Sequence, residues 1–88
     1  MIRANVRFTG NVQGVGFRAT TRDIATSYKV VGWVRNEADG SVTLAAEGEA
    51  DEVARFLDEI HDRMHGRIER ADRHDQRPIG EEGFEILY

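Results

Sequence analysis

The chain has 88 residues, of which 40% are hydrophobic and 32% charged, so its length and composition fit one small domain over residues 1–88 with a modest core. Its net charge of −4 argues against generic nucleic-acid binding, which usually needs a basic face. The absence of cysteine excludes disulfides, thiolate catalysis and cysteine-ligated metal sites.

The first part of the chain predicts a strand, a helix and a second strand. Apolar and polar residues alternate over residues 2–8, and this period of two is typical of a half-buried strand. Beyond the glycine-rich segment 10–16, apolar residues recur at helical spacing and predict an amphipathic helix over residues 17–28. Residues 30–34 are rich in β-branched side chains and predict a second strand, in which we expect Trp33 to belong to the core.

The rest of the chain predicts a hairpin, a second helix and two further strands. The pair Asp39-Gly40 is a hairpin signal, and the alternating apolar residues after it predict a third strand over residues 42–46. Apolar residues then recur at i, i+3, i+4 and i+7, which predicts a second helix over about residues 50–64. A weakly apolar strand over about residues 67–74 and a short strand over residues 84–88 complete the prediction.

This order of elements, β-α-β-β-α-β with one more strand, is that of the split βαβ, ferredoxin-like α+β fold. We therefore expect two helices packed on one face of an antiparallel sheet, each burying its apolar stripe. Many unrelated functions use this fold, so the fold alone does not predict an activity.

The glycine-rich segment has features of an anion-binding loop. It joins a predicted strand to a predicted helix, so its far end is a helix N-terminus with unpaired N–H groups. Gly14 and Gly16 can adopt backbone angles that let successive N–H groups converge on an anion. Arg18 follows in the first helical turn, where its guanidinium can bind phosphate oxygens in pairs. Taken alone, this pattern fits an anion site and an ordinary glycine-rich turn equally well.

Two motifs resemble those of a known family. The segment G-N-V-Q-G-V-G-F-R at residues 10–18 resembles the acylphosphatase signature G-x-V-Q-G-V-G-F-R. The segment G-W-V-R-N at residues 32–36, followed by Asp39-Gly40, resembles the second motif of that family, G-W-V-x-N-x-x-D-G. Gly48 and the ending over residues 83–88 resemble further landmarks, so the resemblance covers nearly the whole chain.

The resemblance implies a ferredoxin-like enzyme that hydrolyses acyl phosphates to a carboxylate and inorganic phosphate. It implies that Arg18 binds the phosphate with the loop N–H groups, that Asn36 positions the attacking water, and that no metal or organic cofactor takes part. The expected phosphate-binding residues are Val12, Gln13, Gly14, Val15, Gly16, Phe17 and Arg18. Without the resemblance, Asn36 would be interpreted as an ordinary turn residue, because Asn is common in turns.

Three positions depart from the family pattern. Asn11 stands where many members carry a basic residue, Thr20 stands at a position that is often aromatic, and Leu87 replaces an arginine that is common near the C-terminus. None of the three belongs to the expected catalytic pair. They bear on rate and stability rather than on the type of reaction.

Other function classes have weaker signals in the sequence. His61 and His65 have the i, i+4 spacing of a metal-ligand pair, but no second ligand cluster accompanies them, which favours a solvated helix surface. A ferredoxin-like RNA binder would need exposed aromatic residues and a basic sheet, and the sequence has neither pattern. A phosphate-binding module of a larger protein, without turnover, is disfavoured because the domain extends over the whole chain.

We expect a monomer that acts on a small acyl phosphate in the cytoplasm, with no nucleic-acid or membrane partner. Residues 1–5 lack the apolar run of a signal peptide, and no apolar stretch approaches the length of a membrane span. The sequence shows no recognisable lining for an acyl group, so the physiological substrate stays open.

Overall fold

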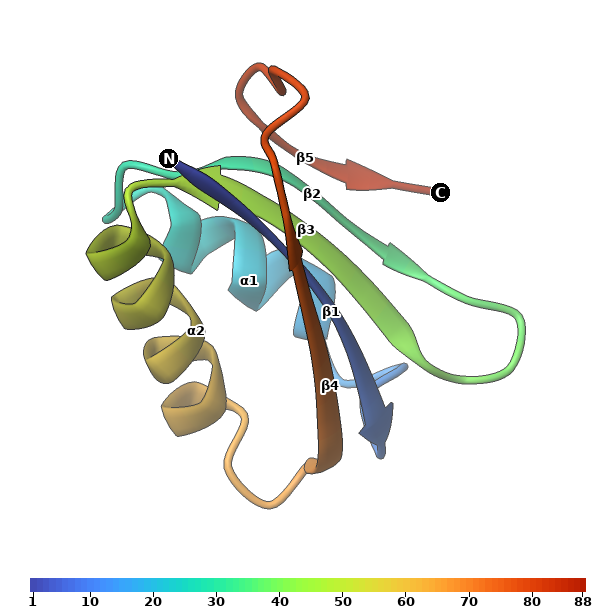
Figure 1. Ribbon diagram of the computed structural model, residues 1–88. Coiled ribbons are helices and arrows are strands. Elements are labelled where there is room, and N and C mark those ends of the chain that lie inside the picture. Colours follow the sequence, from blue (N-terminus) through green and yellow to red (C-terminus); the bar gives the residue numbers. More distant parts are fainter.

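A five-stranded sheet carries both helices on one of its faces (Figure 1). The structure is a computed structural model that describes residues 1–88. Its elements in chain order are β1 (Ile2–Gly10), α1 (Phe17–Ala25), β2 (Val31–Asn36), β3 (Val42–Gly48), α2 (Ala50–Arg63), β4 (Ile68–Gln76) and β5 (Phe84–Leu87). The predicted ferredoxin-like order of elements is therefore confirmed.

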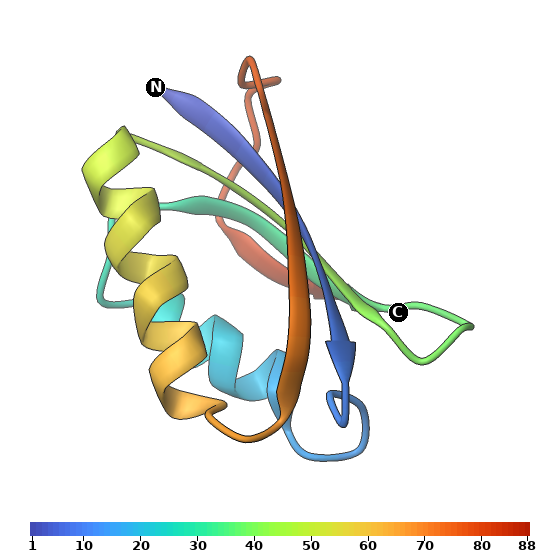
Figure 2. The same ribbon diagram turned by 60° about the horizontal axis from the view of Figure 1, so that its bottom comes forward.

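The sheet has the strand order β4-β1-β3-β2-β5. The first four of these strands pair antiparallel, as expected, whereas β5 pairs parallel to β2. The sheet is therefore mixed rather than wholly antiparallel. The reason is topological: β4 ends at the end of the sheet where β2 begins, so a chain that crosses this end and enters beside β2 must run in the same direction (Figures 1 and 2).

The core lies between the sheet and the two helices, as Figure 2 shows from a second side. The alternation predicted for β1 is confirmed, because Ala4, Val6 and Phe8 are all buried on the helix side. The expectation for Trp33 is wrong: this side chain is half-buried and is not part of the core. Val34, the next residue in β2, belongs to the core. Because successive side chains of a strand point to opposite faces, Trp33 must point to the helix-free face of the sheet.

Helix α1 is shorter than the sequence predicts, because it ends at Ala25 rather than near residue 28. The next three N–H groups bond to carbonyls three residues back, so the chain tightens into a turn. The Thr26 hydroxyl also donates to the carbonyl of Asp23 at 2.6 Å, and such local bonds compete with helix continuation. Tyr28 keeps its predicted apolar contact from this turn, packing against the core.

The strand with the weakest sequence signal, β4, is present and is an edge strand. Only Ile68 and Ala71 of this strand pack against the core, and the rest of it is exposed. This burial pattern explains the weak signal, since a strand that covers so little of the core has few apolar positions. Its charged side chains also discourage pairing with another edge.

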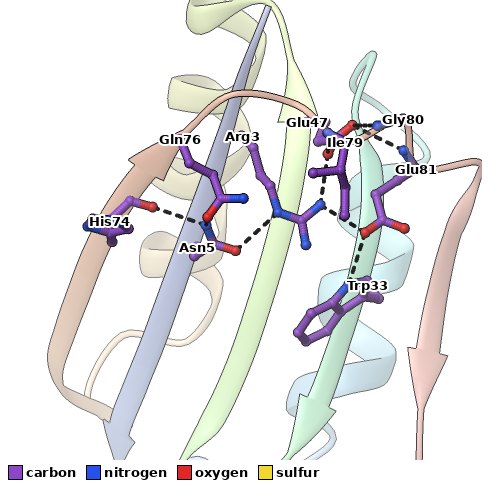
Figure 3. Close-up of polar contacts among 9 residues, drawn as sticks. All are labelled: Arg3, Asn5, Trp33, Glu47, His74, Gln76, Ile79, Gly80 and Glu81. Atoms are coloured by element: carbon purple, nitrogen blue, oxygen red, sulfur yellow. Dashed lines mark hydrogen bonds and ion pairs between the residues drawn. The ribbon is translucent and has the colours of Figure 1, made fainter.

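The segment between β4 and β5 is held by a buried glutamate of β3 (Figure 3). The Glu47 carboxylate accepts the backbone N–H groups of Ile79, Gly80 and Glu81 at 2.8, 3.2 and 3.1 Å. Its oxygen Oε2 also accepts a hydrogen bond from Arg3 Nη1 at 2.7 Å, and both of these side chains are almost fully buried. Three successive N–H groups and one guanidinium thus surround a single carboxylate.

The same arginine reaches a second carboxylate in that segment. Arg3 Nη1 lies 2.8 Å from Glu81 Oε2, which also accepts a hydrogen bond from Trp33 Nε1 at 3.2 Å (Figure 3). Burial acts to raise the pKa of Glu47, but the bonds from the backbone and from Arg3 outweigh it, and the pKa of this carboxyl is lowered. The network fixes the crossing segment and therefore the start of β5.

Candidate functional site

Most of the backbone N–H groups in the loop between β1 and α1 are unpaired, although that of Asn11 donates to the carbonyl of Arg67 at 2.9 Å. Gly14 and Gly16 have φ angles of +74° and +77°, so the unusual backbone predicted for both is confirmed. A Cβ atom at either position would meet no other group within 4 Å, which shows that both glycines face open space. None of the N–H groups from Val12 to Gly16 donates a hydrogen bond to another group of the protein. Such a run of N–H groups before a helix favours an anion.

The beginning of this loop is fixed from two sides. The side chain of Val12 is fully buried in the core. The side-chain amide of Gln13 donates to two backbone carbonyls of the β2–β3 hairpin. These two side chains therefore anchor the loop, and only their backbone N–H groups are available for the phosphate-binding role predicted for them.

Arg18 is the second residue of α1 and has no acidic partner. Its Nη1 donates to the backbone carbonyl of Leu87 at 3.5 Å, and its guanidinium carbon lies 5.0 Å from the centre of the Tyr88 ring. The end of the chain thus supports the side chain without neutralising its charge. The Leu87 side chain, one of the departures from the family motif, is not involved in this contact, which uses the backbone.

Asn36 is the last residue of β2, and its side chain makes no hydrogen bond within the protein. The hairpin that follows it is well held. The Asp39 carboxylate accepts from the Ser41 N–H at 3.0 Å and from the Ser41 hydroxyl at 2.6 Å, and it pairs with Arg7. These bonds, with those of the Ser41 hydroxyl first, lower the pKa of Asp39 to about 2.

These groups meet at one pocket of about 210 Å³. It is lined by Gly14, Gly16, Phe17, Arg18, Ala19, Asn36, Ile86 and Tyr88. Five of these residues are candidates from the sequence, and Arg18 and Asn36 are among them. The candidates Val12, Gln13 and Val15 do not line the pocket. The side chains of Val12 and Val15 pack in or against the core, and that of Gln13 bonds to the hairpin.

Sequence reasoning missed the apolar side of the pocket, formed by Ala19, Ile86 and Tyr88. The alternation of Phe84, Ile86 and Tyr88 was visible as a strand signal. Their place beside the loop follows only from the parallel pairing of β5 with β2, which carries the end of the chain to Arg18. No local pattern in the sequence indicates that pairing.

The arrangement suits a small anion with an uncharged substituent. Unpaired N–H groups and the guanidinium of Arg18 supply positive potential, and no Asp or Glu side chain lines the pocket to oppose it. The amide of Asn36 adds a neutral donor and acceptor next to them. Fold and pocket together define a ferredoxin-like α/β sandwich with a loop of unpaired N–H groups between its first strand and first helix.

Comparison with known proteins assigns the family. The acylphosphatase family model matches residues 4–86, and the chain belongs to the acylphosphatase family. An acylphosphatase of Roseiflexus sp. (strain RS-1) is 42% identical over 90 residues, which cover 100% of this chain and 97% of that protein.

Two solved structures show the same fold. The crystal structure of acylphosphatase from Bacillus subtilis superimposes with a TM-score of 0.93 at 30% identity, and the match covers 100% of both chains. A crystal structure of full-length HypF in the phosphate- and nucleotide-bound form matches with a TM-score of 0.85 at 27% identity, covering 100% of this chain and 12% of that one. The same fold therefore occurs alone and as a small part of a longer chain.

Two further observations concern residues outside the pocket. His61 is an exposed residue of α2, and its ring packs edge-on against the buried Phe8, with ring centres 5.8 Å apart. Neither helix of the structure is long and apolar enough to cross a membrane.

Proposed function

We propose that this chain hydrolyses acyl phosphates and that the pocket at the β1–α1 loop is its active site. The observation that carries the proposal is the meeting of unpaired loop N–H groups, the unneutralised Arg18 and the free amide of Asn36 in one pocket of a member of the acylphosphatase family. Residues 1–88 act as one domain in this proposal.

The loop and Arg18 bind the phosphoryl group. Backbone N–H groups from Val12 to Phe17 donate to its oxygens, and the guanidinium of Arg18 balances their charge. Charge shifts over these oxygens as the phosphoryl group transfers, so donors fixed in advance lower the barrier. Because Gly14 and Gly16 have no side chains, the phosphate can approach the backbone closely.

Asn36 positions the attacking water. Its amide can accept one hydrogen bond from the water and donate another, but it cannot remove a proton. The water oxygen forms a bond to phosphorus as the bond to the acyl oxygen breaks, and the electron pair leaves with the carboxylate. The proton passes to the phosphate or to solvent. A carboxylate is a good leaving group, so positioning and charge stabilisation suffice without a strong acid.

The acyl group lies against the apolar side of the pocket, toward Ala19, Ile86 and Tyr88. The proposal requires no metal and no organic cofactor, since each step is assigned to a group of the chain. We further propose that the protein acts as a monomer in the cytoplasm on a small-molecule substrate, without a nucleic-acid or membrane partner.

The test is hydrolysis of benzoyl phosphate by the purified protein in the presence of EDTA. The parent should turn over, and Arg18→Ala and Asn36→Ala should each lose activity by at least about a hundredfold. Arg55→Ala is the matched control, because this arginine lies on α2 and contacts only Asp51 and Glu52. Circular dichroism should show that all variants remain folded.

Two results would count against the proposal in different ways. A parent that binds inorganic phosphate but does not hydrolyse benzoyl phosphate would instead be a binding module. That alternative is compatible with a fold that also occurs as 12% of a longer chain. Full activity in either site variant would remove the assigned role of that residue. Loss of activity in EDTA, restored by a divalent cation, would contradict metal independence.

A further inference from the structure

The side chain of Gln13 joins the glycine loop to the hairpin that carries Asn36. Its Nε2 donates to the backbone carbonyl of Glu37 at 2.7 Å and to that of Ser41 at 2.9 Å. Glu37 directly follows Asn36, and Ser41 directly precedes Val42, which pairs with Asn36 across the ladder. Both amide hydrogens of Gln13 are therefore bonded to the base of the hairpin. One is bonded to the residue after Asn36, and the other to the residue before Val42, the pairing partner of Asn36.

The hairpin does not need these two bonds to close. The carbonyl of Glu37 also accepts the N–H of Gly40 at 3.2 Å, and the carbonyl of Ser41 also accepts the N–H of Glu37 at 2.8 Å. A carbonyl oxygen has two lone pairs, so each backbone acceptor stays satisfied without Gln13. The contribution of Gln13 is thus a connection between two segments rather than the formation of the turn.

On the loop side, Gln13 lies between the anchored and the open part of the segment. Val12 before it is fully buried, and Gly14 after it lines the pocket. Along the chain, Gln13 and Glu37 are 24 residues apart, whereas the hydrogen bond joins them directly. A displacement of the loop relative to the hairpin would change the distance between a bound phosphate and Asn36.

We propose that Gln13 is a positioning residue that fixes the phosphate-binding loop relative to Asn36, and thereby places the attacking water in line with phosphorus. Its side chain does not touch the substrate, and this role rests on the proposed function of the pocket. Misplacement of reacting groups by about 1 Å can reduce a rate by about a hundredfold, so a small shift is sufficient. The binding of phosphate itself depends on the loop N–H groups and Arg18.

The first test is Gln13→Met, which keeps the length of the side chain and removes both donors. Gln76→Met on β4 is the matched control, because the side chain of this exposed glutamine makes one hydrogen bond, to Asn5, far from the pocket lining. We expect kcat for benzoyl phosphate to fall at least tenfold in Gln13→Met, while KM and the inhibition constant of inorganic phosphate change less than threefold. The control should match the parent in all three, and thermal melting should show both variants folded.

The second test is Gln13→Glu, followed from pH 7 to pH 4. An ionised carboxylate has no hydrogen to donate and faces two carbonyl oxygens, whereas a protonated carboxyl can donate to one of them. We expect the ratio of variant to parent kcat to rise as the pH falls toward the ordinary glutamate value of about 4.3. The same ratio for Gln13→Met should stay flat.

The outcomes separate this inference from the proposed function. An active parent with an unchanged kcat in Gln13→Met would overturn the positioning role alone. A loss of phosphate affinity in parallel with kcat would assign Gln13 to the shape of the phosphate site and would also overturn it. An inactive parent would reject the proposed function, and this inference with it.

Discussion

Two segments at opposite ends of the sheet present the same chemistry in different states (Figures 1 and 2). In the segment between β4 and β5, successive N–H groups and Arg3 surround the carboxylate of Glu47 (Figure 3). In the segment between β1 and α1, successive N–H groups lie next to Arg18 and donate to no group of the protein. Backbone donors and one arginine thus serve structure at one end and, in our proposal, catalysis at the other.

We call each set of backbone N–H groups with its arginine a cradle. In our proposal, the source of the anion decides the role of each cradle. A carboxylate supplied by the chain makes its cradle part of the folded state, so that removing a partner costs stability. A cradle without an internal acceptor keeps its donors for a ligand, and changes there should alter activity with little effect on stability. Arg18→Ala, the activity test above, should therefore lower activity with little effect on stability. A matched change at Arg3 should lower stability with little effect on activity.

The largest expected effect on stability comes from Arg3→Met. This change leaves the Glu47 carboxylate almost fully buried without its guanidinium partner, and breaking a buried pair in this way costs about 3–5 kcal/mol. Urea denaturation should report this loss as a lower free energy of unfolding, while kcat of the folded fraction stays near that of the parent. Arg70→Met, which breaks an exposed pair with Asp72, should change stability by less than about 1 kcal/mol.

A double variant sharpens this first prediction. In a simple buried pair, replacing both partners with apolar residues often restores stability. Here Arg3→Met combined with Glu47→Leu should not recover, because the N–H groups of Ile79, Gly80 and Glu81 would lose their acceptor. Recovery to the stability of the parent would show that Glu47 acts only as the partner of Arg3.

The second expected effect is a dependence of stability on pH. The folded-state pKa of Glu47 is lowered, so its contribution is fully present above the unfolded value of 4.5 and is lost as the pH falls through the lower folded value. The free energy of unfolding of the parent should therefore fall on acidification below about pH 4.5. Glu47→Gln should be less stable at pH 6 but should lose less on acidification. Equal acid dependence in both proteins would assign the effect to other carboxyls, such as Asp39.

The sequence predicts the regular elements well where their side chains face the core. The alternation over residues 2–8 and the helical spacing over residues 50–64 depend on burial of one face, and burial is a property that periodicity records. The end of α1 is less predictable, because local bonds such as that of Thr26 compete with the helix. The prediction for Trp33 is wrong for another reason. An apolar run does not show which face of a sheet a residue takes.

The site is predictable where its residues are close in sequence and hidden where they are distant. The glycine loop and Arg18 form one motif, and the resemblance to a family added Asn36. Ile86 and Tyr88 reach the pocket only through the strand pairing of β5, and Glu47 lies 44 residues from the arginine it binds. Such partners depend on three-dimensional packing, which a single sequence does not show.

The smallest expected effect on stability separates the two cradles most directly, through a matched pair of glycines. Gly14 and Gly80 have φ angles of +74° and +88°, and a Cβ atom at either position would meet nothing within 4 Å. Gly14→Ala and Gly80→Ala should therefore destabilise the fold to a similar, small extent of about 1 kcal/mol, the cost of a left-handed backbone in alanine. Of these two glycines, only Gly14 lines the pocket, so only Gly14→Ala places a methyl group at the proposed phosphate site. Its inhibition constant for inorganic phosphate should rise by about tenfold, a loss of about 1.4 kcal/mol in binding, and that of Gly80→Ala should not change.

Equal inhibition constants in the two variants would show that phosphate does not approach the backbone at Gly14, and the β1–α1 loop would lose its role as the open cradle.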